Sequence, residues 1–173
     1  MPSNIVPSSK INLDYISNLE TVIITEKKHG NEIKLNLPPD FGKRLLTYFK
    51  LDICHYPQSF AGFDCYAFVS MLANVKYCKA NPRFEYEERM PTEGDFVALS
   101  QDNTTIESIK HWALYLGKGY YLSKFGMSGL GTQSLISVMD LEGMHKLYES
   151  KHVLIARPKH GAEPWNGFKN IVV

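Results

Sequence analysis

The sequence predicts a single domain of the α+β class, and three observations support this prediction. Two helical patterns follow an early hairpin, several short apolar strands fill the second half of the chain, and no internal repeat divides it. With 173 residues, 44% of them hydrophobic, the chain is long enough to bury one sizeable core. We therefore expect a meandering antiparallel sheet packed against helices.

Residues 1–50 predict an extension that packs on the same domain. A β-branched run, a turn and an alternating apolar pattern predict a hairpin over residues 20–37. Asp40 caps a predicted helix whose apolar side chains recur every four residues from Phe41 to Phe49. One stripe of this helix is expected to face the body of the protein.

Residues 51–160 are expected to form the core of the domain, and residues 161–173 are expected to form a C-terminal tail. A helix is expected to begin at Cys65, because apolar side chains recur behind it at helical spacing. Residues 81–93 are charged and contain two prolines, which is typical of a solvated connection. Strands are then expected at residues 96–99, 109–116, 120–122, 134–138 and 152–156, with a helix at residues 141–150.

Charge and hydropathy argue against several classes of partner. The 19 basic residues nearly balance 18 acidic ones, so no strong overall field favours nucleic acid. No stretch approaches the roughly 20 apolar residues of a membrane span, so no integral membrane segment is expected. Residues 1–10 lack the pattern of a secretory signal, and three cysteines cannot all pair. We expect a cytoplasmic protein, or one delivered out of the cell by a signal-peptide-independent secretion system.

Cys65 is the leading candidate for a nucleophile. A thiol reacts as thiolate, and the unpaired amides and dipole of a helix N-terminus lower the pKa of a thiol placed there. Cys65 stands three and seven residues before Phe68 and Leu72, so its sulfur is expected to point toward the packed face and the sheet. The sequence therefore predicts an activated thiol that faces the core.

His111 is the candidate base for this thiol. In a strand beginning near it, His111, Ala113 and Tyr115 share one face, while Trp112, Leu114 and Leu116 share the other. The small Ala113 leaves room for a helix end, so we expect Cys65 to meet the face that carries His111. A thiol on a helix N-terminus and an imidazole on an adjacent strand are two parts of a cysteine hydrolase site.

Three segments resemble blocks of a known family. Residues 62–69 (GFDCYAFV) resemble the DCSGFV segment of NlpC-type cell-wall peptidases, and residues 94–97 (GDFV) and 111–117 (HWALYLG) resemble that family's next two blocks, in the same order. With a closing strand at residues 153–157, the resemblance covers residues 56–157. The block at 111–117 also resembles lecithin retinol acyltransferase relatives, which are circularly permuted. No cysteine follows His111 here, which favours the unpermuted order of the papain-like peptidases.

The resemblance implies a role for each matching position. Cys65 becomes the nucleophile and His111 the general base and then acid. Tyr56 becomes a substrate or oxyanion contact, and Asp64 faces a substrate amine. Tyr66 stands where the family usually has a serine that reads the substrate terminus, so this departure puts cell-wall dipeptide specificity in question.

The third catalytic position, which orients the imidazole, falls by this alignment on Ser123. A hairpin turn centred on Gly117 places Ser123 across from His111, whereas a two-residue loop at 117–118 places Lys124 there. Gln133 or a backbone carbonyl is a further alternative. The third position therefore stays open.

No cofactor is expected. Cysteines at positions 54, 65 and 78 lack a close Cys-x-x-Cys pair, so no metal site is predicted.

The residues and the resemblance together predict a cysteine-dependent amidase or peptidase. Its Cys-His dyad would act through a thioacyl-enzyme on peptides or muropeptides, either in the cell or as a secreted effector with an immunity or host protein partner. Two alternatives remain: an acyltransferase or phospholipase-like thiol enzyme, and a catalytically silent binding module.

Overall fold

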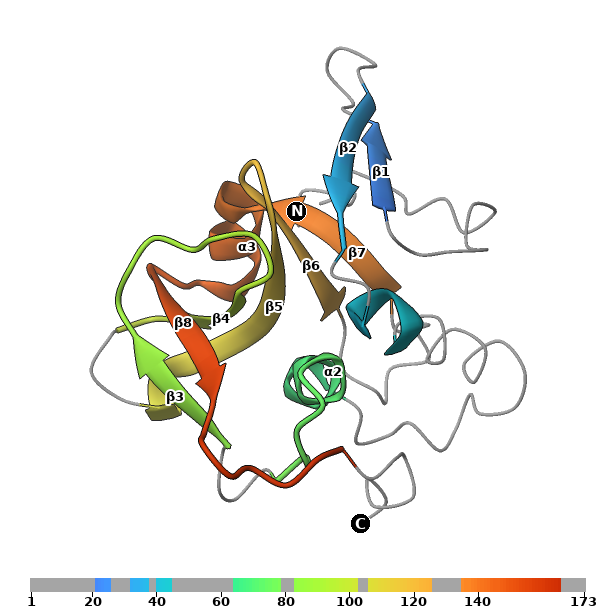
Figure 1. Ribbon diagram of the computed structural model, residues 1–173. Coiled ribbons are helices and arrows are strands. Elements are labelled where there is room, and N and C mark those ends of the chain that lie inside the picture. Colours follow the sequence, from blue (N-terminus) through green and yellow to red (C-terminus); the bar gives the residue numbers. More distant parts are fainter. Residues whose placement is uncertain are drawn as a thin grey trace.

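A six-stranded antiparallel sheet organises the second half of the chain (Figure 1). The computed structural model describes residues 21–25, 32–37, 40–44, 64–78, 83–102, 106–125 and 135–165. Its elements are β1 (Thr21–Thr25), β2 (Glu32–Asn36), α2 (Cys65–Leu72), β3 (Phe84–Glu87), β4 (Phe96–Ser100), the 3₁₀ turn η2 (Ile106–Ser108), β5 (Ile109–Gly117), β6 (Tyr120–Phe125), β7 (Leu135–Asp140), α3 (Leu141–Tyr148) and β8 (His152–Pro158).

The sheet has the order β3-β8-β4-β5-β6-β7, and every neighbouring pair is antiparallel. Strands β4 to β7 form the expected meander, with β8 returning beside β4. The α+β class is therefore confirmed. The tight turn between β5 and β6 has positive φ at Lys118 (53°) and Gly119 (83°), the backbone of a hairpin turn that glycine favours.

Strand β3 was not predicted, because it lies inside the expected charged connection at residues 81–93. Its sequence FEYE alternates aromatic and acidic residues, with Phe84 buried and Glu85 exposed. It pairs with β8 from Phe84↔Pro158 to Glu87↔Ile155 and forms one edge of the sheet. Composition alone does not distinguish a short edge strand with charged outward side chains from a loop.

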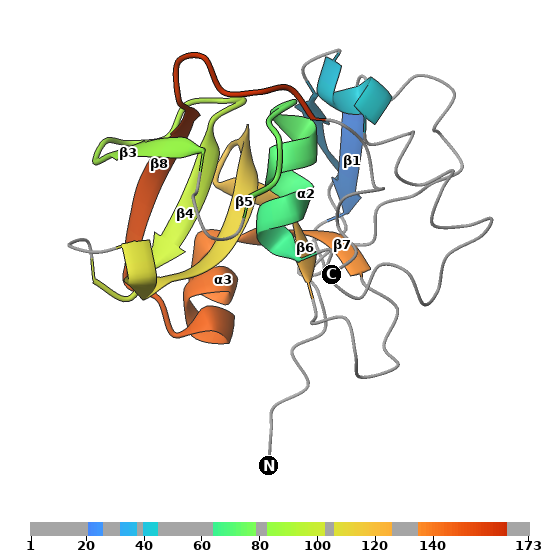
Figure 2. The same cartoon turned by 90° about the horizontal axis from the view of Figure 1, so that it is seen from below.

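The two faces of the sheet carry separate apolar clusters, and α2 and α3 lie on opposite sides (Figures 1 and 2). Helix α2 contacts β5 and β6 on one face. The sheet residues of that face include Phe84, Phe96, Ala98, Trp112, Leu114, Leu116, Leu122 and Ala156. The α3 face includes Val97, Leu99, Ala113, Tyr121, Ile155 and Met144, the last from α3 itself. The predicted alternation along residues 111–116 is thus confirmed.

Helix α2 begins at Cys65, as expected. The Asp64 side chain accepts a hydrogen bond of 2.8 Å from the backbone N–H of Ala67, which satisfies one of the free amides of the first turn. The helix ends at Leu72, and Asn74 turns the chain with a φ of 56°. All residues of α2 after Cys65 are buried, so packing rather than propensity holds this short helix.

The expected hairpin within residues 20–37 is confirmed, with β1 and β2 in register from Thr21↔Asn36 to Thr25↔Glu32. Leu35 and Leu37 are buried in the cluster on the α2 face. Residues 40–44 are helical, and the Phe41 ring lies 5.1 Å from the Phe96 ring. The rest of the predicted helix, to Phe49, falls outside the described residues.

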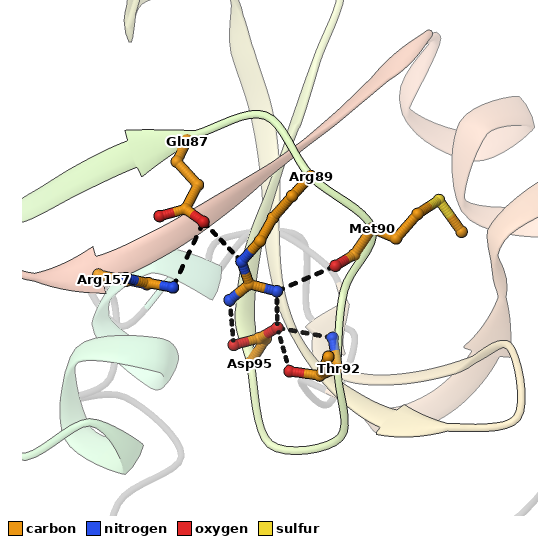
Figure 3. A network of polar contacts seen from close by, with 6 residues as sticks. All are labelled: Glu87, Arg89, Met90, Thr92, Asp95 and Arg157. Carbon is orange, nitrogen blue, oxygen red and sulfur yellow. Dashed lines mark hydrogen bonds and ion pairs between the residues drawn. The ribbon is translucent and has the colours of Figure 1, made fainter.

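A polar network ties β3 to the start of β4 (Figure 3). The Arg89 guanidinium donates two hydrogen bonds to Asp95, of 2.7 and 2.9 Å, and one of 2.6 Å to Glu87. Asp95 also accepts from the backbone and hydroxyl of Thr92 at 2.6 and 2.9 Å. Burial raises the pKa of Asp95, but the hydrogen bonds from Arg89 and Thr92 outweigh it and lower the pKa overall.

We expect Asp95→Asn to lower Tm by about 3 °C at pH 7, because a bidentate, partly buried ion pair and the Thr92 bonds are lost. Since the folded pKa of Asp95 is lowered, its contribution is present above the unfolded pKa and is lost as pH falls through the folded pKa. Thermal unfolding followed by circular dichroism measures both effects. Glu163→Gln is the control, because it breaks only an exposed ion pair with Lys76. Equal losses in the two variants would contradict the prediction.

Candidate functional site

The sheet opens between β5 and β6. The last residue pair of these strands is Leu114↔Leu122. From this pair toward the start of β5, β5 remains paired only with β4, for example at Leu99↔His111. From the same pair toward the end of β6, β6 remains paired only with β7, as far as Phe125↔Leu135. The described part of β5 before Leu114 therefore has an edge that β6 does not cover.

The backbone N–H of Trp112 points into this opening. The N–H of Tyr115 donates to the Asp95 carbonyl on the β4 side. Because N–H directions alternate along a strand, Trp112, three residues earlier, directs its N–H to the other side. The Trp112 amide acts on the Cys65 sulfur and lowers the pKa of its thiol, and α2 contacts both β5 and β6 where the two strands separate.

Cys65 is partly buried, and its thiol is protonated in the resting protein. Burial and then the Asp64 charge raise its pKa to about 11, against hydrogen bonds from the backbone amides of Trp112, Tyr66 and Cys65, which lower it. The sequence predicted a lowered pKa from the helix N-terminus, and this prediction is wrong. The amides do act on the sulfur, but desolvation of the thiolate is the larger effect.

Both carboxylate oxygens of Asp64 contact neighbouring groups of the protein. One carboxylate oxygen caps α2 through the Ala67 amide, and the other lies 3.5 Å from the Tyr77 hydroxyl. Burial and then the Asp64 charge raise the pKa of Tyr77 to about 12. The role expected for Asp64, facing a substrate amine, remains a prediction.

His111 lies on the α3 face of the sheet, opposite the face that carries α2. Its side chain is 1% exposed, and its ring stacks on Tyr148 of α3 with centroids 3.7 Å apart and planes at 8°. We expected Cys65 to meet the face that carries His111, and this was wrong, because α2 packs on the Trp112 face. Burial lowers the pKa of His111 to about 3, so the imidazole is neutral at physiological pH.

Two electrostatic effects nevertheless connect the thiol with the surroundings of the imidazole. The backbone amide of Trp112, the residue that follows His111 in the chain, lowers the pKa of Cys65. After the larger effect of burial, an ionised Cys65 also raises the pKa of Tyr148, whose ring lies on the imidazole. Cys65 itself packs against the apolar cluster of the α2 face, near the open edge of β5.

Ser123 is not paired with His111 in the sheet. The observed register, Leu114↔Leu122, places neither Ser123 nor Lys124 opposite His111, so both predicted registers are wrong. A bulge between Tyr115 and Gly117 shifts the strand pairing by one residue. The Ser123 hydroxyl is buried and makes no hydrogen bond to any described residue. Its orienting role stays untested, and Gln133 lies outside the described residues.

Tyr66 belongs to the core. It is 7% exposed, and its ring lies 5.2 Å from that of Tyr77 and 4.8 Å from that of Trp112. Its hydroxyl accepts the backbone N–H of Arg83 at 3.2 Å. This packing leaves little of Tyr66 for the substrate contact that was expected of it. Tyr56, the other expected substrate contact, lies outside the described residues.

Comparisons of the chain with protein-family models, with curated proteins and with solved structures gave no match in any of the three. Among the described residues, no group of three or more His, Cys, Asp or Glu side chains is arranged to hold a metal ion. None of the described helices combines the length and apolar character of a membrane span.

Sequence reasoning missed Tyr148 and the backbone of Trp112. Tyr148 was placed only within a predicted helix, and no spacing rule links it to His111, which lies 37 positions earlier in a strand. One signal was available: Met144 and Tyr148 are four residues apart, so they share a helical face that packs on the sheet.

We expect the buried His111 to make stability depend on pH. Its folded pKa of about 3 lies below the ordinary value of 6.5, so the unfolded chain binds a proton that the folded protein excludes. The free energy of unfolding should therefore fall as pH decreases from 6.5 toward 3, by up to about 1.4 kcal/mol per pH unit. Urea unfolding of wild type and His111→Gln across this range isolates the effect. A constant difference between the two proteins would contradict it.

We also expect Asp64→Asn to make the Cys65 thiol more acidic. Asparagine retains the helix cap but removes the charge that raises the pKa of Cys65. Alkylation of Cys65 by iodoacetamide at pH 8 should rise about tenfold, the effect of one pKa unit. Asp140→Asn removes the equivalent cap charge from α3 and is the matched control. No difference between the two variants would argue against the Asp64 effect.

Proposed function

We propose that the protein is a cysteine-dependent amidase or peptidase of papain-like fold, with Cys65 as nucleophile and His111 as general base and acid. One observation carries the proposal: the start of α2, with the thiol of Cys65, lies against the open edge of β5, where the backbone amide of the residue that follows His111 favours the thiolate. The segment resemblance to NlpC-type peptidases at residues 62–69 and 111–117 supports the same pair of residues.

The resting pair is neutral, and this sets the order of proton transfers. As the sulfur attacks an amide carbonyl, the thiol proton moves to the neutral imidazole of His111. The imidazolium then protonates the leaving amine as the C–N bond breaks, which leaves a thioester on Cys65. Water gives a proton to His111 and attacks the thioester, and the acid leaves as the thiol regains its proton. No oxidant or cofactor takes part.

The α2 N-terminus supports the charge that develops during attack. The amides of Cys65, Tyr66 and Trp112 already act on the sulfur and favour its anionic form. The substrate class that fits the resemblance is a peptide, including cell-wall muropeptides. An effector delivered to another cell is the second setting that the sequence allows.

A catalytically silent binding module is the second candidate, and the partial burial of Cys65 together with the full burial of His111 favours it. A thiol with a pKa of about 11 and an imidazole stacked on Tyr148 are also the features of an inert core. An acyltransferase is supported by the block at 111–117 and by Tyr66, which stands in place of the serine that reads the substrate terminus.

The pH profile of Cys65 alkylation distinguishes an enzyme with a working Cys65–His111 pair from a silent binding module. The Cys54→Ser/Cys78→Ser background leaves one thiol, because the chain has three cysteines. If His111 accepts the proton, the rate with iodoacetamide reaches a plateau between pH 5 and 8, and His111→Gln lowers this plateau at least about tenfold. In a silent module the rate instead rises about tenfold per pH unit toward the thiol pKa, and His111→Gln changes nothing.

Turnover is tested directly by mass spectrometry with peptidoglycan fragments, peptides and phospholipid vesicles. We expect amide cleavage that Cys65→Ala abolishes and Cys78→Ser retains, because Cys78 is a second free thiol outside the opening of the sheet. Acyl exchange on vesicles without peptide cleavage would favour the acyltransferase. Undiminished turnover in Cys65→Ala would exclude a thioacyl-enzyme.

A further inference from the structure

The imidazole of His111 lies face to face with an aromatic ring. The ring centroids of His111 and Tyr148 are 3.7 Å apart and their planes differ by 8°. At this separation the two rings are in contact over their faces, so the imidazole cannot tilt on that side unless Tyr148 moves. With 1% of the His111 side chain exposed, Tyr148 is part of the wall that fixes the imidazole plane.

Helix α3, which ends at Tyr148, is held firmly at its first turn and along its buried face. Asp140 caps the helix by accepting the Gly143 N–H at 2.8 Å. A Cβ at Gly143 would lie 2.9 Å from Cγ of Met139, so the helix backbone approaches β7 at a distance that suits glycine. Met144 is fully buried, and Tyr148 follows it by about one helical turn on the same face.

Tyr148 is also linked to the other member of the proposed pair. The charge of an ionised Cys65 contributes to raising the pKa of Tyr148, after the larger effect of burial. One side chain therefore contacts the imidazole through its ring and lies within electrostatic range of the thiol.

We infer that Tyr148 is a positioning residue, whose ring sets the plane of the His111 imidazole for proton exchange with Cys65. The inference rests on the proposed function and adds a residue to it. Stacking acts on the ring plane, and it operates alongside any group that contacts the ring nitrogens. A polar third residue was expected to orient the imidazole. The ring face of Tyr148 in α3 supplies part of that orientation.

Tyr148→Leu and Tyr148→Phe test this inference in the single-thiol background. Leucine removes the flat face and phenylalanine retains it. We expect Tyr148→Leu to lower the plateau of Cys65 alkylation between pH 5 and 8 about tenfold, most of the loss seen in His111→Gln, and Tyr148→Phe to restore it to within about threefold of wild type. Tyr115→Leu is the matched control, because it removes a ring from the same sheet face, where Tyr115 contacts Tyr121 rather than His111.

The outcomes separate the inference from the function on which it rests. A loss in Tyr148→Leu with retention in Tyr148→Phe and Tyr115→Leu supports it. Loss in His111→Gln but equal rates in Tyr148→Leu and Tyr115→Leu overturns the inference and leaves the proposed function in place. An unchanged profile in His111→Gln overturns both.

A second measurement covers the case in which Tyr148→Leu does not fold. Tyr148→Met fills the volume with a flexible chain and provides no ring plane. In spectra of isotope-labelled histidine, assigned with His111→Gln, we expect the His111 ring protons to lose their upfield ring-current shift in Tyr148→Met and keep it in Tyr148→Phe. A lowered alkylation plateau together with the lost shift supports positioning. A lost shift with an unchanged plateau overturns it.

Discussion

The opening of the sheet between β5 and β6 is the constraint on which the site depends. It leaves the Trp112 N–H, which points away from β4, without a strand partner in a buried setting. A buried amide without a partner costs about 1–3 kcal/mol, so another group is needed there. The Trp112 amide acts on the Cys65 sulfur, and α2 packs where β5 and β6 separate. The same feature brings a helix from one face close to residues of the other.

Burial sets the electrostatics of this site more strongly than the helix terminus does. Three backbone amides favour the thiolate of Cys65, yet desolvation and the Asp64 charge keep the thiol protonated. Desolvation acts in the opposite direction on His111 and keeps it neutral. A helix N-terminus therefore identifies where a thiol meets favourable dipoles, but the depth of the sulfur decides its charge.

Much of the fold followed from sequence, whereas the relation between the two site residues did not. The periodicity of residues 109–116 correctly separated His111 from Trp112, and the apolar spacing behind Cys65 correctly marked the start of a helix. Which of the two strand faces receives α2 depends on tertiary packing, because both faces of β5 are apolar. Strand β3 and the bulge near Gly117 were missed for a similar reason: each is defined by its partner strand rather than by its own composition.

A neutral thiol at Cys65 and a neutral imidazole at His111 are expected when the two groups come from opposite faces of one sheet. Separating a thiolate from an imidazolium inside the core would require two charges to be desolvated, and their attraction offsets that cost only in part. A neutral thiol and a neutral imidazole avoid the cost, at the expense of a weaker nucleophile. In the proposed reaction the proton therefore moves as the sulfur attacks, because neither ion is stable there alone. Such coupling requires the imidazole to be in the correct plane beforehand, which is the property that a stacked ring on a firmly held α3 provides.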